Sequence, residues 1–303
     1  MKINVLLALL MIISAIPAYS GGNAESINTQ EISLNGITEI NIEYSSDEIS
    51  IFTGTSDALV IKEYMNRNNK NYYAQITSTG NTVTVKKGNR PLFTYLNNRA
   101  EVYLPLSYIN SLKIKTSSGR IEAVDNIICQ DVNIESSSGR ITVKNITAGK
   151  VNIKSSSGNI HGNKVAGNAY LKSESGNIVI DSIDGNVSAE TSSGHFELNR
   201  AAGSVNAKTS SGNIKCTTAE TSADITLATS SGSVNLNLNK NKSFNFTSRT
   251  SSGRLNTPFP EKLFVPVNDK NLVKGVIGEK NDIDEIPAIN IKTSSGSIRI
   301  EWI

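Results

Sequence analysis

Few side chains in this sequence could carry catalytic or metal chemistry. The only histidines are His161 and His195, and the only cysteines are Cys129 and Cys216. A zinc site needs three or four ligands from one neighbourhood, and two separated histidines do not supply them. An exported cysteine pair could form a disulfide, but only if the two Cα atoms lie within about 7 Å of each other. The elements that hold these residues therefore decide what they can do.

Serine is the commonest candidate nucleophile, and it recurs in one short motif. The first copies read Thr116-Ser117-Ser118-Gly119-Arg120-Ile121 and Ser136-Ser137-Ser138-Gly139-Arg140-Ile141. An enzyme needs its nucleophile once, whereas the serine before the glycine returns in every copy. We therefore interpret it as structural, with stacked hydroxyl groups bonding backbone groups at a corner of the fold.

One glycine marks each copy of the motif. These structural turn glycines are Gly119, Gly139, Gly158, Gly176, Gly194, Gly212, Gly232, Gly253 and Gly296. Their spacings are 20, 19, 18, 18, 18, 20, 21 and 43 residues, and the last is expected to hide a degenerate or expanded repeat. Apolar residues stand two after and seven before each glycine, and polar residues alternate with them, which is typical of strands. We expect these glycines to adopt positive φ in a turn between two strands.

A unit of 18 to 21 residues cannot bury its own apolar face, but copies stacked on one another can. The sequence therefore predicts an all-β fold, a single-stranded parallel β-helix or β-solenoid, with the right-handed sense of parallel crossovers. No proline interrupts residues 106–257, as continuous hydrogen-bonded ladders require. Cys129 and Cys216 then lie four or more rungs apart, so two free cysteines are expected, and both histidines are expected at the surface.

The chain divides into four segments by this pattern. Residues 1–20 read as a cleaved signal peptide, with Lys2, an apolar run and Ala18-Tyr19-Ser20 before the cleavage point. Residues 21–105 are expected to form N-terminal rungs and a cap. In this segment Asp47 occupies the position of the turn glycine in one degenerate repeat, and residues 75–80 are expected to form another degenerate repeat. Residues 106–257 form the regular repeats. Residues 258–303 form an insertion and a C-terminal capping rung, in which Trp302 plugs the core.

One outward column, four residues before each glycine, is rich in cations. It contains Glu135, Glu190 and Ala228 together with a possible ligand-facing basic stripe of Lys115, Lys154, Lys172, Lys208, Arg249 and Lys292. Solubility is one explanation of the stripe. Attraction to an anionic envelope polymer or lipid headgroup is the other. With 30 Lys and Arg against 27 Asp and Glu, the net charge of +3 is too small to favour nucleic acid as the partner.

The Ser-Ser-Gly-x-Ile array, the opening Ser45-Ser46-Asp47-Glu48-Ile49 and the ending at 273–278 and 293–298 resemble a known bacterial family. This is the "putative adhesin" domain family, a domain of unknown function related to the autotransporter-adhesin-like head domain. The resemblance covers roughly residues 30–303. It implies a β-helix in the cell envelope, and it supplies no catalytic residues.

Together these observations predict an exported, non-catalytic β-solenoid that acts as an adhesin-like binding module. We expect it in the periplasm, at the cell surface or outside the cell, and not spanning a membrane after signal cleavage. No cofactor or metal is expected, and the partner is an unknown envelope polymer or protein. Two alternatives remain open: a protein-binding partner or sensor module in envelope-stress signalling, and a polysaccharide-active enzyme.

Overall fold

A computed structural model describes residues 26–90, 98–219, 223–240, 243–259, 264–265, 272–277 and 286–303. The predicted signal peptide lies outside these residues. Within them the chain is almost entirely β-strand, with one short 3-10 helix, η1 (Lys70–Tyr72). The all-β prediction is confirmed.

The N-terminal strands are β1 (Ser26–Ser33), β2 (Glu39–Glu43), β3 (Glu48–Gly54), β4 (Ala58–Met65), β5 (Gln75–Thr79), β6 (Thr82–Lys86), β7 (Asn98–Pro105) and β8 (Ser111–Thr116). The central strands are β9 (Ile121–Ser136), β10 (Ile141–Ser155), β11 (Ile160–Ser173), β12 (Ile178–Asp184), β13 (Val187–Thr191), β14 (Phe196–Ala201), β15 (Val205–Thr209), β16 (Ile214–Thr218), β17 (Ile225–Thr229) and β18 (Val234–Leu238). The C-terminal strands are β19 (Phe244–Thr250), β20 (Leu255–Asn256), β21 (Phe264–Val265), β22 (Leu272–Ile277), β23 (Ala288–Thr293) and β24 (Ile298–Trp302).

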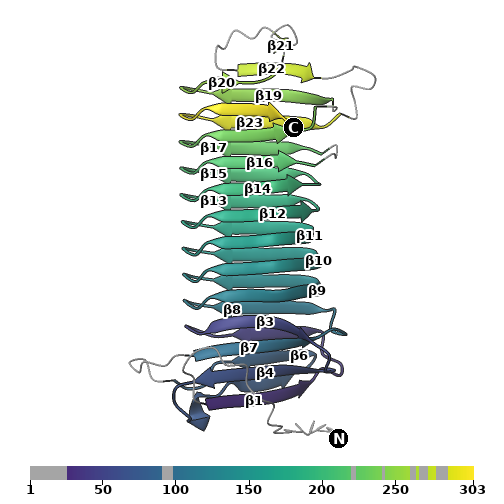
Figure 1. Cartoon of the computed structure of the whole chain (residues 1–303), viewed down its shortest axis with the longest axis vertical. Coiled ribbons are helices and arrows are strands. Elements are labelled where there is room, and N and C mark those ends of the chain that lie inside the picture. The colour runs from purple at the N-terminus through teal and green to yellow at the C-terminus, as the bar shows by residue number, and fades with distance from the viewer. Residues whose placement is uncertain are drawn as a thin grey trace, which may run out of the picture.

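The strands stack into a column with two main walls (Figure 1). Wall A contains the strands before each turn, in the spatial order β6, β2, β8, the ends of β9, β10 and β11, then β13, β15, β17, β23 and β19. Wall B contains the strands after each turn: β7, β3, the starts of β9, β10 and β11, then β12, β14, β16, β18, β24 and β20. All these pairings are parallel, so the predicted β-solenoid is confirmed. Its right-handed sense stays a prediction.

The core is a thin line of aliphatic side chains between the walls. Ile141, Ile160 and Ile178 are register partners on successive rungs, separated by 19 and 18 residues, and all three are fully buried. The column seven residues before each glycine is buried as well, from Leu112 to Ile289. Strict alternation therefore leaves every second side chain of both walls facing outward.

The turn glycines are required for a different reason from the expected one. Positive φ occurs at other glycines, such as Gly167 and Gly185 in the opposite corner, and not at the nine turn positions. Instead each turn glycine lies directly against the backbone of the neighbouring rung. A Cβ on Gly194 would stand 2.0 Å from the carbonyl oxygen of Gly176, a distance that no side chain can occupy. Asp47 occupies the same place beneath Gly119, as the sequence predicted.

A buried hydroxyl group secures each of these contacts. The Ser or Thr three residues before the glycine is buried, whereas the two residues that follow it, both serine in every turn except for Glu174, are exposed. Thr191 Oγ1 accepts a hydrogen bond from the Gly194 amide at 3.1 Å and donates one to the Gly176 carbonyl at 3.3 Å. The structural hydroxyl of the motif is thus its first residue and not the serine beside the glycine.

The ends of the stack depart from sequence order. At the C-terminal end, β23 lies between β17 and β19, and β24 lies between β18 and β20. Among the described residues of the 43-residue spacing, β22 pairs antiparallel with β19 and forms no parallel rung, and the chain next adds β23 on the inner side of β19, beneath the rung of Gly253. Trp302 lies on β24, in the rung beneath that of Gly253, and its ring packs against the core, 5.1 Å from the ring of Phe259.

The N-terminal end shows a similar inversion. The β6–β7 rung lies outside the β2–β3 rung that precedes it in sequence. Residues 75–80 are not a degenerate repeat, because β5 and β6 form an antiparallel hairpin with Gly80 at its turn. Antiparallel strands close both ends, with β4 on β7 and β22 on β19. Such strands cover edges that would otherwise be free to pair with another chain.

We predict that Gly194→Ala lowers the free energy of unfolding by about 1–3 kcal/mol, the usual cost of forcing extra volume into a packed position. The matched control is Gly54→Ala, since a Cβ there would meet the Tyr103 Cβ at an ordinary 3.6 Å. Urea unfolding of the two variants provides the measurement. Equal midpoints for both would contradict the backbone contact as the reason for the glycine.

Candidate functional site

The outer face of wall A brings the predicted basic stripe into one straight column. Residue pairing gives the spatial order Lys86, Glu43, Lys115, Glu135, Lys154, Lys172, Glu190, Lys208, Ala228, Lys292 and Arg249. The six predicted cations are therefore aligned, but Glu135 and Glu190 separate them into groups. Lys154 and Lys172 are direct neighbours, and so are Lys292 and Arg249.

Several ammonium groups in this column lack a partner within the described residues. No ion pair or hydrogen bond is formed there by the side chains of Lys115, Lys172 or Lys208, although acidic residues occupy adjacent rungs. Cross-rung ion pairs occur elsewhere on both walls, as between Lys86 and Glu43 at 3.2 Å on wall A and between Lys215 Nζ and Glu197 Oε1 at 2.6 Å on wall B. Lys115, Lys172 and Lys208 are thus available to a ligand.

Tyr170 is the residue on this face that the sequence analysis missed. It lies on β11, two residues before Lys172, and its ring is 5.5 Å from Lys154 Nζ. Its hydroxyl donates a hydrogen bond to Glu190 Oε2 at 3.3 Å. Burial, together with the Glu190 charge, raises the pKa of Tyr170, so this hydroxyl keeps its proton. The sequence did contain an indication of this residue, because Tyr170 is the only aromatic among the residues that stand six positions before each turn glycine.

Two shallow depressions adjoin at Tyr170. One, of about 350 Å³, runs from Lys115 to Lys172 and is lined by three lysines, by Glu135 and Glu174, and by residues of the turns. The other, of about 520 Å³, runs from Lys150 to Thr226 and is lined mainly by Asn, Ser and Val side chains. Tyr170 lines both depressions, so a ligand crossing from one to the other would pass over its ring.

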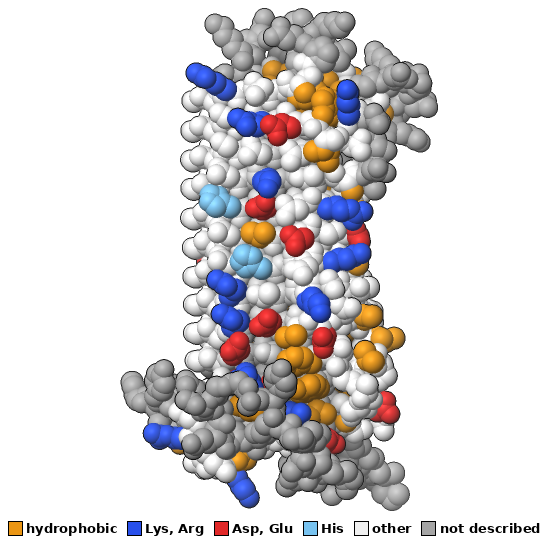
Figure 2. All heavy atoms as spheres, viewed as in Figure 1, with side chains coloured by type: hydrophobic (Ala, Val, Ile, Leu, Met, Phe, Trp, Pro, Cys, Tyr) orange, Lys and Arg blue, Asp and Glu red, His pale blue; other side chains and the backbone are white. Residues whose placement is uncertain are grey.

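The histidines lie on wall B and serve no common centre. His195 Nδ1 accepts a hydrogen bond from the Asn213 amide at 2.9 Å, the role that Asn177 Oδ1 plays one rung below. His161 stands in another column, where burial and the Arg140 charge lower its pKa. Figure 2 shows this face, on which cations and acids are intermixed. In the described part of the chain, no three His, Cys, Asp or Glu residues are grouped so that they could hold a metal ion.

Both cysteines are free and buried, as predicted. Burial raises the pKa of the Cys129 and Cys216 thiols to about 12. We predict that a thiol reagent at pH 8 labels neither in the native protein but labels two per chain in denaturant, where thiols recover a pKa of about 8.5. Mass spectrometry counts the labels. Fewer than two in denaturant, without a covalent dimer, would contradict the separation of the cysteines.

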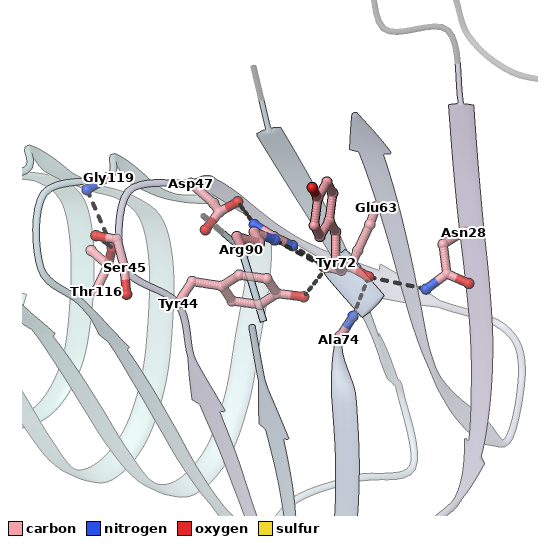
Figure 3. A network of polar contacts seen from close by, with 10 residues as sticks. All are labelled: Asn28, Tyr44, Ser45, Asp47, Glu63, Tyr72, Ala74, Arg90, Thr116 and Gly119. Atoms are coloured by element: carbon pink, nitrogen blue, oxygen red, sulfur yellow. Dashed lines mark hydrogen bonds and ion pairs between the residues drawn. The ribbon is translucent and has the colours of Figure 1, made fainter. Parts of the chain in front are cut away.

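A second polar cluster is buried in the N-terminal cap (Figure 3). Arg90 forms ion pairs with Asp47 and with Glu63, the latter at 2.7 Å, and no more than 7% of each of these side chains is exposed. Burial raises the pKa of Glu63, and hydrogen bonds from the Ala74 amide and Asn28 oppose that shift. Because every partner is internal, this network joins the cap to the turn residue Asp47, and it is not a ligand site.

We predict that Arg90→Met destabilises the protein by about 3–5 kcal/mol, because two carboxylates would be left buried without their counter-charge. Lys86→Met is the control, since the Lys86–Glu43 pair at 3.2 Å is about half exposed and should contribute under about 1 kcal/mol. Thermal unfolding compares the two. A similar small loss from both would show that the buried network does not secure the cap.

The fold and turn define the class of this protein: a parallel β-solenoid whose rungs stack through Ser/Thr–Gly turns. A family profile described as Toastrack DUF4097 matches residues 37–301, almost the whole described structure. The chain belongs to this family, a domain of unknown function, which confirms the family resemblance. No curated protein sequence matches the chain.

Solved structures of similar proteins come from several bacteria. A "putative lipid binding protein" from Parabacteroides distasonis has a TM-score of 0.48 and 14% identity, covering 92% of this chain and 97% of its own. A "putative adhesin" from Bacteroides fragilis has a TM-score of 0.46 and 16% identity, covering 92% and 98%. Within the described residues, no helix has the length and hydropathy needed to cross a bilayer.

Proposed function

We propose that this protein is an exported, non-catalytic binding module of the cell envelope or cell surface. In this proposal the outer face of wall A holds an extended polymer, in the manner of an adhesin. The observation that carries the proposal is that Lys115, Lys172 and Lys208, which have no partner within the described residues, stand in one column beside two adjoining depressions. Export is supported by the sequence features of residues 1–20.

The shape of the face favours an elongated ligand. Eight rung steps separate Gly119 from Gly253 in the stack, which is roughly 38 Å at about 4.8 Å per strand. The two depressions lie along the stack direction, from the rung of Lys115 to that of Thr226. A polymer lying along the column could therefore contact several rungs at once, and contacts that are weak singly would add up.

Charge favours an anionic ligand. The six predicted cations of the column outnumber Glu135 and Glu190, and surface charges of one sign attract counter-charged ligands over about 8 Å at physiological salt. Such attraction weakens as the salt concentration rises, which distinguishes it from purely apolar binding.

We predict that the triple variant Lys115→Gln/Lys154→Gln/Lys172→Gln binds anionic envelope polymers at least about tenfold more weakly than the natural protein, a loss of about 1.4 kcal/mol. The matched control is Arg140→Gln/Lys144→Gln/Arg254→Gln, which removes three exposed cations outside wall A. A polymer-binding screen at low and high salt, with each hit titrated against both variants, provides the measurement.

Three outcomes would contradict the proposal. An equal loss in both triple variants would indicate general charge attraction with no role for wall A. Saturable binding to proteins alone would favour the sensor alternative, and release of shortened polymer would show an enzyme.

A further inference from the structure

Tyr170 is isolated on a polar surface. Across the nine regular turns, the three outward columns of wall A contain no other aromatic residue. Its neighbours in its own column are Asn152 and Ser188, and Lys172 lies on the same strand and face. A half-buried ring among amide, hydroxyl and ammonium groups offers an apolar face surrounded by hydrogen-bonding groups.

The ring is held in place before any ligand arrives. The Tyr170 hydroxyl is bonded to Glu190 on one neighbouring rung, and Lys154 on the other approaches the ring. A side chain already fixed in orientation loses little entropy on binding. Tyrosine in such a position packs flat against an apolar surface while its hydroxyl stays paired, and one face of a pyranose ring is such a C–H surface.

The charges beside the ring are arranged in groups. Lys154 and Lys172 are register partners on adjacent strands, so their stems are about 4.8 Å apart, and neither forms an ion pair with any residue that the structure describes. One carboxylate has two oxygens and can accept a hydrogen bond from each ammonium group. Ammonium–carboxylate hydrogen bonds of this kind are stronger than neutral ones.

The glutamates on either side of the lysine pair restrict where a bound ligand can carry negative charge. Glu135 and Glu190 flank the lysine pair, and Lys115 and Lys208 lie beyond them. From the centre of the pair, each outer lysine is two and a half rungs away, roughly 12 Å at about 4.8 Å per strand. Two pyranose units of an extended chain cover such a span. A polymer with a carboxylate on every sugar would place charges opposite the two glutamates, whereas one with a carboxylate on alternate sugars would not.

We propose that Tyr170, Lys154 and Lys172 form a subsite for an acidic sugar in a polysaccharide that carries one carboxylate per disaccharide. The pyranose ring stacks on Tyr170, and its carboxylate lies between the two ammonium groups. This inference rests on the proposed function, because it names the ligand class of the same wall A face.

The test uses hyaluronan oligosaccharides as the probe, since they carry one carboxylate per disaccharide. Polygalacturonate, with a carboxylate on every sugar, and neutral cello-oligosaccharides serve as comparison ligands. Calorimetric titration of the full protein is expected to show the order hyaluronan, polygalacturonate, cello-oligosaccharide in decreasing affinity. Tyr170→Ala should weaken hyaluronan binding about tenfold, and Tyr170→Phe, which keeps the ring, should stay within about twofold.

Further variants separate the charge from the ring. Lys172→Gln should weaken hyaluronan binding and reduce its salt dependence, whereas Lys215→Gln on wall B should change neither. All substituted side chains point outward, and an unchanged melting midpoint verifies folding. Equal affinity of Tyr170→Ala and the natural protein, or a preference for polygalacturonate, would overturn the subsite.

The two proposals can fail separately. Binding of neutral chains or phosphodiester polymers across wall A, without binding of hyaluronan, would overturn the acidic-sugar subsite and leave the binding function standing. Binding only to vesicles with 30% phosphatidylserine would overturn the subsite in favour of a lipid surface. Failure of every polymer and vesicle to bind would overturn both proposals.

Discussion

Direct backbone contact between successive turns is the constraint on which this structure depends. Each turn glycine lies so close to the carbonyl of the neighbouring rung that no Cβ fits, and a buried hydroxyl accepts a hydrogen bond from its amide; in six of the nine turns that hydroxyl also donates to the neighbouring glycine carbonyl. Every rung is therefore held at the same corner. Because the corner fixes the register of both walls, outward residues form straight columns, and one residue per repeat sets the chemistry of each column.

Local spacing predicted the regular part of the fold, because a period of 18 to 21 residues determines strands, turn and inward columns together. The reason for the glycines could not be derived in the same way, since the contact that excludes a side chain is between rungs. The bonding hydroxyl was not distinguished by sequence either: the position of Thr116 is Ser or Thr in every copy, but the position of Ser118 is Ser in every copy. Only the burial of the first position and the exposure of the second separate the two.

The ends and the candidate site show where such reasoning stops. Periodicity gives the order of rungs along the chain but not in space, so the positions of Gly296 below Gly253 and of β6–β7 outside β2–β3 were not predicted. The six cations were predicted as one column. Their pairing with acids depends on which rungs are neighbours, and Arg90 meets Asp47 and Glu63 across 43 and 27 residues with no repeat to reveal it.

The inserted position of β23 and β24 has a consequence for how the chain is completed. A solenoid whose rungs follow sequence order can grow one turn at a time as residues emerge from a ribosome or an export channel. Here β19 and β20 emerge before the strands that separate them from β17 and β18. The C-terminal end of the column therefore cannot form its final strand pairs until residues 288–302 are present, or it must open so that these residues can insert. Its assembly is a late, non-sequential step, and a chaperone or protease would meet an unfinished end until that step is complete.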